Sequence, residues 1–331
     1  MRATRRSVLW AGAATVVAPV LGMRQAARAA DQTIKLALIA QVGQPVERGA
    51  QLFKQLVESG SNGKLGVQIF PGGQLGGEIE QQDSVANGTI QMCNLGVAVT
   101  AGKLPKLNIL NMYYLWKDRD HMDRVMTGPV GQKLFKEYEE RTGNRVLPAN
   151  WQQGTRQMLA NRKALTPAEM RGIKIRVTAG APIFNELWSA MGANPVPLPF
   201  PEAYSAMQTG VVDAVELPAD WIFNNGFHKL GKFLLETEHS FYTNLPLINA
   251  KFFNGLSPDL QKLVEDASRQ AGKFQTETVL KEQADLLGKI KDGGVEMVKL
   301  DVEPFRQSVR PVYEKNMGIW GRELYEQISA A

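Results

Sequence analysis

The sequence has little of the chemistry that many enzyme active sites use, because its 331 residues include one cysteine and three histidines. Cys93 alone excludes an intramolecular disulfide, and its apolar neighbours predict a buried structural thiol. His121, His228 and His239 are too far apart in the sequence to show metal-ligand spacing. Neither a G-x-S-x-G elbow nor a G-x-G-x-x-G turn is present. We therefore predict no enzyme, no catalytic residues and no cofactor. A metal ion between the protein and a ligand remains an alternative, although no spacing of potential metal ligands in the sequence indicates one.

Long apolar runs are also scarce, and the one that stands out extends from Val8 to about Gly22. Basic residues precede it and small residues follow it, which is the layout of a secretory signal. The pair Arg5-Arg6 favours twin-arginine export over the Sec route. A membrane anchor is the alternative, but the run has about 15 residues and a spanning helix needs roughly 20. We predict a signal peptide over residues 1–30 that is removed on export to the periplasm.

The excess of positive charge belongs mainly to this leader. The chain has 38 basic and 33 acidic residues, and its pI is about 9.2. Five of the arginines and none of the acids lie in residues 1–30, so the remaining chain has 33 of each sign. A net charge near zero gives no indication of binding to nucleic acid, which requires an excess of basic residues on the binding surface. After residue 30 no apolar segment is long enough to insert into a membrane.

Short apolar runs alternate with amphipathic stretches along most of the chain, which predicts an α/β fold with largely parallel strands. The first part is predicted to run strand, helix, strand, helix, strand. These elements are residues 34–40, 46–59, 65–70, 77–87 and 90–97.

The pattern changes from about residue 144, which favours a second α/β lobe. Thr166, Pro167 and Glu169 form the signature of a helix start. The predicted strands are residues 146–151, 158–161, 172–177 and 211–217, with an extended segment at 195–199 and helices at 182–191 and 201–208.

A long helix is predicted over Ser257–Lys291, since one apolar stripe runs along it. Such a helix could brace two lobes, and a strand at 295–300 and two helical segments follow it. The predicted organisation is a first lobe at 31–150, a second at 151–250, and the bracing helix and C-terminal segments, packing on both lobes, at 251–331.

Five stretches in order resemble the DctP-type solute-binding subunits of TRAP transporters. Any one of them would be weak evidence, but their order and spacing agree with the family from about residue 34 to residue 320. The stretches are FPGGQLGGE at 70–78, GTR at 154–156, LTPAEMRGIKIRV at 165–177, GANPVPL at 192–198 and PEAYSAMQTGVVDA at 201–214.

The resemblance implies a two-lobe, type II-like periplasmic-binding-protein fold with a ligand cleft between the lobes. It implies a receptor that binds a small organic acid and delivers this carboxylate ligand to the TRAP membrane subunits. Two alternatives are a module that presents the ligand to a sensor kinase and an enzyme acting in the cleft. The enzyme would need a nucleophile or an acid–base pair, and none is visible.

The resemblance also implies two ligand-binding arginines. Arg176, predicted to follow a strand near the start of a helix, matches the family's main carboxylate anchor, and Arg156 matches a second arginine. An arginine suits this role because its planar fork donates two parallel hydrogen bonds to a carboxylate. An ordinary ion-paired arginine is the alternative for each.

Other candidate ligand contacts follow from position. Phe200 matches a family position that packs against the ligand. A core aromatic without ligand contact is the alternative. Glu78 starts a helix and could either contact a ligand hydroxyl or interact with the helix dipole. Gln41 follows the first strand, where open α/β sheets bind ligands.

The sequence departs from many family members after residue 214. Where sialic-acid and dicarboxylate binders often have an asparagine that touches the substrate, this chain has Leu217, while Glu216 is retained and Trp221 lies nearby. This difference argues against sialic acid. We hypothesise a more apolar pocket for an aromatic or branched carboxylate.

Overall fold

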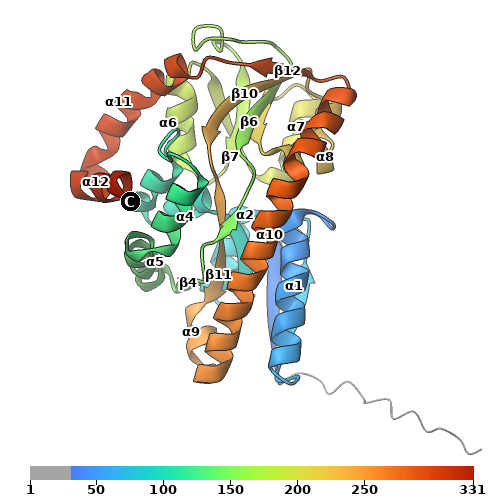
Figure 1. Cartoon of the computed structure of the whole chain (residues 1–331), viewed down its shortest axis with the longest axis vertical. Helices are drawn as coiled ribbons and strands as arrows, with labels where there is room; N and C mark the ends of the chain where they lie inside the picture. Colours follow the sequence, from blue (N-terminus) through green and yellow to red (C-terminus); the bar gives the residue numbers. More distant parts are fainter. Residues whose placement is uncertain (1–30) are drawn as a thin grey trace, which may run out of the picture.

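The computed structural model describes residues 31–331, so the predicted signal peptide lies outside the described residues. Two six-stranded sheets, one in each half of the molecule, form its framework (Figure 1). The first sheet has the order β2-β1-β3-β11-β4, and β5 also pairs with β11. Its strands are β1 (Gln32–Leu38), β2 (Leu65–Phe70), β3 (Met92–Gly96), β4 (Asn144–Val146), β5 (Trp151–Gln152) and β11 (Thr243–Asn249).

The second sheet has the order β12-β10-β6-β9-β7-β8. Strand β9 lies between β6 and β7, and this arrangement places the site described below. Its strands are β6 (Arg156–Ala160), β7 (Lys174–Thr178), β8 (Asn194–Leu198), β9 (Ala214–Leu217), β10 (Phe233–Ser240) and β12 (Glu296–Lys299).

Helices cover both sheets (Figure 1). Several begin at a proline, which suits the first helical turn because its missing N–H would have no partner there. The helices are α1 (Pro45–Gly60), α2 (Glu78–Ala86), α3 (Val97–Ala101), α4 (Arg119–Thr127), α5 (Pro129–Thr142), α6 (Pro182–Ala190), α7 (Phe200–Gln208), α8 (Ala219–Asn224), α9 (Ala250–Asn254), α10 (Pro258–Asp292), α11 (Glu303–Trp320) and α12 (Arg322–Ala330), with 3-10 turns at Pro105–Asn111 and Phe227–Lys229.

The predicted opening of the fold is confirmed. Strands β1, β2 and β3 are parallel neighbours, and α1 and α2 connect them. The apolar residues of β1 are buried, Ile34 and Leu36 among them, as expected of a strand covered on both faces. Cys93 in β3 is buried too, and burial raises the pKa of its thiol well above the usual value.

The prediction of largely parallel strands is wrong, because the sheets are mixed. Strand β11 returns antiparallel between β3 and β4, and in the second sheet β6 runs antiparallel to both β9 and β10. Residues 243–249 thus belong to the first sheet although they lie inside the segment 151–250 predicted for the second lobe. Pairing between strands distant in sequence leaves no local signal, so the sequence pattern could not reveal this crossing.

The predicted helix start at Thr166 is also wrong. The Thr166 hydroxyl accepts from the Glu169 N–H at 3.4 Å, so the capping contact forms. The segment nevertheless remains a turn, because Gly172 adopts a φ of 82° and leads directly into β7.

Helix α10 runs along both halves of the molecule (Figure 1). It packs on α1 and β5 at one end and on α8 at the other. Close approach to α1 depends on two glycines that face Trp151, since a Cβ on Gly49 or Gly272 would come within 3 Å of its ring. The sequence prediction of a long helix here is confirmed to within one residue at each end.

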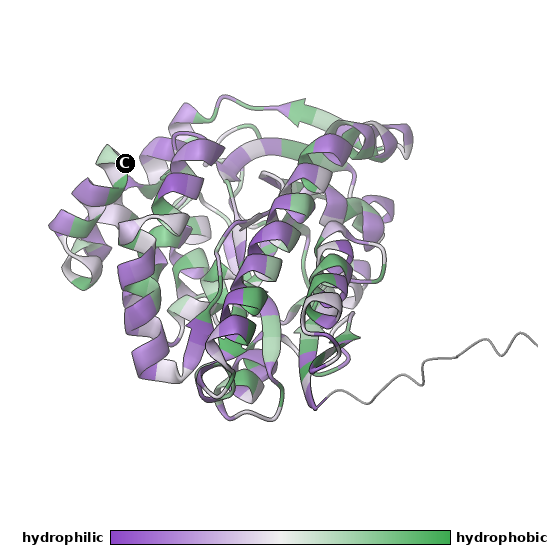
Figure 2. Ribbon diagram, turned by 60° about the horizontal axis from the view of Figure 1, so that its bottom comes forward, coloured by the Kyte–Doolittle hydropathy of each residue, from purple (hydrophilic) through white to green (hydrophobic). Residues whose placement is uncertain are grey.

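The helical surface alternates between hydrophilic and hydrophobic residues, as the banding of α10 shows (Figure 2). Within residues 31–331, none of the helices combines the length and the apolar character needed to cross a bilayer.

Candidate functional site

A cavity lies where residues of the two sheets meet. The volume open to the centres of water-sized molecules is about 50 Å³, within about 480 Å³ of space between protein atoms that includes the solvent at its mouth. Its wall combines charged and amide groups with apolar and aromatic side chains, as is usual for ligand sites. The lining residues are Ile39, Glu78, Asn94, Leu95, Gly96, Val99, Gln153, Arg156, Arg176, Thr178, Phe200, Leu217, Trp221, Tyr242 and Asn244.

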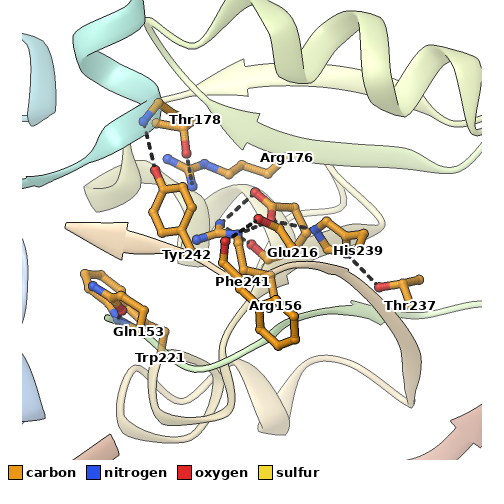
Figure 3. Close-up of polar contacts among 12 residues, drawn as sticks. Gln153, Arg156, Arg176, Thr178, Glu216, Trp221, Thr237, His239, Phe241 and Tyr242 are labelled. Carbon is orange, nitrogen blue, oxygen red and sulfur yellow. Dashed lines mark hydrogen bonds and ion pairs between the residues drawn. The ribbon is translucent and has the colours of Figure 1, made fainter. Parts of the chain in front are cut away.

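Arg156, the first residue of β6, is held by Glu216 from β9 (Figure 3). Its Nη2 donates to Glu216 Oε1 at 2.7 Å and to the Glu216 carbonyl oxygen at 2.7 Å, and its Nε donates to Oε2. On the other side, Glu216 Oε2 lies 3.3 Å from His239 Nε2. Thr237 Oγ1 lies 2.8 Å from His239 Nδ1 and completes the network.

The charges of this network stabilise one another. Burial alone would lower the pKa of Arg156, but the charge and hydrogen bonds of Glu216 raise it above its usual value. Burial would raise the pKa of Glu216, yet Arg156 and the hydrogen bond to His239 lower it to about 2. Burial lowers the pKa of His239. Glu216 is therefore an anion at neutral pH, and most of its capacity to accept hydrogen bonds is used within the protein.

Arg176 lies within β7, not after a strand as the sequence analysis predicted. Its Nε donates to the Leu198 carbonyl at 2.9 Å, and its Nη1 lies 3.4 Å from Thr178 Oγ1 (Figure 3). Its Nη2 has no hydrogen-bond partner, although the side chain is 3% exposed. Burial lowers the pKa of Arg176 and the charge of Glu78 only partly opposes this. Arg176 thus brings an unsatisfied, desolvated donor to the cavity.

Glu78 begins α2, as predicted, and reaches toward the second sheet. Its Oε1 lies 3.5 Å from Arg176 Nη2, and its Oε2 accepts from the Phe200 N–H at 3.2 Å. The carboxylate therefore interacts with the start of α7 and not only with its own helix.

Aromatic side chains close one side of the cavity. The rings of Phe200 and Trp221 meet edge to face with centroids 4.7 Å apart. The Arg176 guanidinium lies 5.6 Å from the Phe200 ring centre. Trp221 Nε1 donates to Gln153 Oε1 at 2.7 Å, which fixes its ring, and Leu217 adds an apolar contact surface.

Two predicted residues do not line this cavity. Glu216 is fully buried behind Arg156. Gln41 is exposed and borders a neighbouring hollow together with Tyr204 and Phe200. The structure thus brings Arg156, Arg176 and Phe200 together with the predicted Leu217, Trp221 and Glu78, and places Gln41 apart from them.

Sequence reasoning missed polar residues of the first sheet. Neither amide atom of Asn94 has a hydrogen-bond partner although the residue is buried. Its signal was available: an asparagine within the apolar run of β3. Tyr242 left no comparable signal. Its hydroxyl accepts from the Ala98 N–H at 3.2 Å, and its ring centre lies 4.6 Å from the Arg156 guanidinium carbon.

Comparison with known proteins identifies the family. The model of the bacterial extracellular solute-binding protein family 7, DctP, matches residues 36–318. The chain belongs to this family. Among its relatives, it is 33% identical over 274 residues to the 2,3-diketo-L-gulonate-binding periplasmic protein YiaO of Escherichia coli, with 81% of this chain and 83% of the relative covered. It is 26% identical to the sialic acid-binding periplasmic protein SiaP of Vibrio cholerae, with 90% and 92% covered.

Solved structures agree with this assignment. A TRAP periplasmic solute-binding protein of Pseudomonas putida F1 with bound D-glucuronate has a TM-score of 0.86 and 27% identity, covering 90% of this chain and 97% of its own. One of Polaromonas sp. JS666 bound to D-erythronate has a TM-score of 0.87 and 27% identity, covering 91% and 99%. The two-lobe fold and membership in the TRAP solute-binding family are thus confirmed. The chain is a periplasmic solute-binding protein of a transport system and not an enzyme.

Proposed function

We propose that this DctP-family protein is the receptor of a TRAP transporter that binds one small organic acid by its carboxylate on Arg176. After closing on the ligand, it delivers the ligand to the membrane subunits of the transporter. The observation that carries the proposal is the unsatisfied Nη2 of Arg176 at the wall of the cavity.

The physical argument rests on the cost of burying a charge. A buried guanidinium that lacks part of its hydrogen bonds is destabilised, and a carboxylate relieves this with two parallel charge-assisted bonds. Glu78 at 3.5 Å is too distant to supply such a bond in full. Arg156 also lines the cavity, but its Nε and Nη2 already donate hydrogen bonds to Glu216.

Relatives support the class of ligand. The solved neighbours carry D-glucuronate, D-erythronate and succinate, all of which are small carboxylates. Residues of both sheets line the cavity, which suits a hinge closure in which the two lobes clamp the ligand. Similarity to TRAP periplasmic solute-binding proteins supports the membrane subunits of a TRAP transporter as the docking partner.

A thermal-shift screen of residues 31–331 against small organic acids tests the proposal. A ligand at 100 times its dissociation constant stabilises the folded state by about 2.7 kcal/mol. We expect stabilisation by one class of carboxylates in the wild type and in the control Arg171→Ala, whose side chain is exposed. The same acids should leave Arg176→Ala unshifted. An equal shift in Arg176→Ala would contradict the anchor, and reconstituted membrane subunits that take up the acid without this protein would contradict delivery.

A further inference from the structure

We infer that Glu78 makes the cavity selective for hydroxy monocarboxylates and excludes dicarboxylates. This inference rests on the proposed function, since it assumes that a ligand carboxylate occupies Arg176. It adds the class of acid and the residue that determines it.

The first argument is the balance of charges in the wall. Arg156 and Arg176 are the cations among the described lining residues, and Glu78 is the anion. The Glu216 carboxylate balances the charge of Arg156 through two hydrogen bonds, and the Glu216 carbonyl accepts a third. One carboxylate of a ligand can therefore pair with Arg176, and a second would find only Arg156, whose Nε and Nη2 are engaged and whose charge is balanced by Glu216.

The second argument is where Glu78 lies. Its side chain is 10% exposed, and one carboxylate oxygen lies 3.5 Å from the Arg176 Nη2 atom that the ligand would engage. The other oxygen is fixed by the Phe200 N–H. A ligand carboxylate on Arg176 thus has Glu78 as its neighbour, and a group on the adjacent ligand carbon lies within the reach of Glu78.

The chemistry of that neighbouring group decides the selectivity. A hydroxyl donates a hydrogen bond to the Glu78 carboxylate, which strengthens binding because the acceptor is charged. A second carboxylate can only accept, and two like charges in a desolvated site repel each other strongly. Specificity then comes from rejecting the wrong ligand as well as from attracting the right one.

Asn94 supports the same class of ligand. Its buried amide has a donor and an acceptor without partners, and a ligand hydroxyl can satisfy both. The remaining wall at Leu217 and Trp221 is apolar apart from the indole N–H, which is already bound to Gln153. The cavity thus offers one carboxylate position, hydroxyl partners beside it and an apolar side.

Calorimetric titration with four acids tests the inference. D-erythronate and pantoate represent hydroxy monocarboxylates, and succinate and L-malate represent dicarboxylates. We expect the wild type to bind the better of the first pair at least 30-fold more tightly than either dicarboxylate. In Glu78→Gln this ratio should fall at least tenfold, through weaker binding of the hydroxy acid and stronger binding of the dicarboxylate. The control Glu80→Gln changes an exposed residue of the same helix and should keep the wild-type ratio.

Two outcomes would overturn the inference while leaving the receptor proposal intact. One is a Glu78→Gln ratio within threefold of the wild type in a variant whose melting curve shows that it is folded. The other is a wild type that binds succinate or L-malate as tightly as the hydroxy acids. Acids that bind the wild type and Arg176→Ala equally would instead overturn the carboxylate anchor itself.

Discussion

Arg156 and Arg176 line the same cavity from the two strands that flank β9, yet their surroundings differ. Glu216 lies on β9 between them, and its carboxylate accepts two hydrogen bonds from Arg156. Arg176 has a carbonyl and a distant hydroxyl and carboxylate, and one nitrogen without a partner. We therefore expect Arg176, whose Nη2 has no hydrogen-bond partner, to receive the ligand, and Arg156, which makes three hydrogen bonds to Glu216, to shape the site.

The largest expected effect comes from breaking the satisfied pair. Arg156→Met leaves Glu216 as a buried carboxylate with His239 as its remaining side-chain partner. Loss of one partner of a buried pair lowers the free energy of unfolding by about 3–5 kcal/mol. Chemical denaturation measures this loss. The double variant Arg156→Met with Glu216→Leu removes both charges and should recover most of the stability. A double variant that is no more stable than Arg156→Met would contradict the pairing argument.

The unsatisfied arginine should show the opposite behaviour. Arg176→Ala should reduce affinity for the organic acid by about 2–5 kcal/mol, because the ligand carboxylate would be buried without its partner. Its stability without ligand should change much less than that of Arg156→Met. Arg176→Lys should also bind poorly, since a point charge cannot reproduce the planar fork. Calorimetry measures affinity in both variants, and wild-type binding by either would refute the anchor.

Two buried carboxyl groups also differ in their partners, and this difference predicts how the stability of the protein depends on pH. Unlike Glu216, buried Asp220 has no side-chain hydrogen-bond partner, and burial raises its pKa to about 7, which neighbouring backbone N–H groups only partly oppose. The folded protein therefore holds a proton that the unfolded chain releases near pH 3.8. Stability should fall as pH rises from about 4 to about 7, by about 1.4 kcal/mol per pH unit from this group.

Denaturation curves at several pH values test the effect of Asp220. Asp220→Asn removes the titrating group, so it should flatten this part of the pH profile and be more stable than the wild type above pH 7. A variant profile with the wild-type slope would show that Asp220 does not titrate in this range.

The smallest expected effect concerns the apolar wall. Leu217→Asn places an amide where an apolar side chain now faces the cavity. Acids with branched apolar tails should bind about tenfold more weakly, and acids with an additional hydroxyl should lose less. Competition between pantoate and D-erythronate measures the preference. An unchanged preference would count against the hypothesis of an apolar pocket at Leu217.

Local patterns in the sequence predicted much of the fold. Strand β2 has the predicted bounds, and α10 was predicted to within one residue at each end, because burial runs and caps are local signals. The antiparallel return of β11 was not predicted, since it depends on pairing with strands about 100 residues or more away, at β3 and β4.

The site was predicted only in part, because some of its contacts also depend on pairing between distant strands. Arg156, Arg176 and Phe200 were found through resemblance to a family, not through spacing. Sequence could not reveal that Glu216 holds Arg156, because β6 and β9 are brought together only by the sheet. Asn94 was missed although an asparagine in an apolar run was a signal, whereas Tyr242 left none because it precedes β11, whose return to the first sheet depends on distant pairing.

A crystal structure of residues 31–331 with a bound organic acid tests the central claim most directly. We predict that the ligand carboxylate makes two hydrogen bonds to Arg176 while the contacts between Arg156 and Glu216 remain as they are here. A carboxylate bound to Arg156 with Glu216 displaced, and Arg176 without contact to the ligand, would contradict the account.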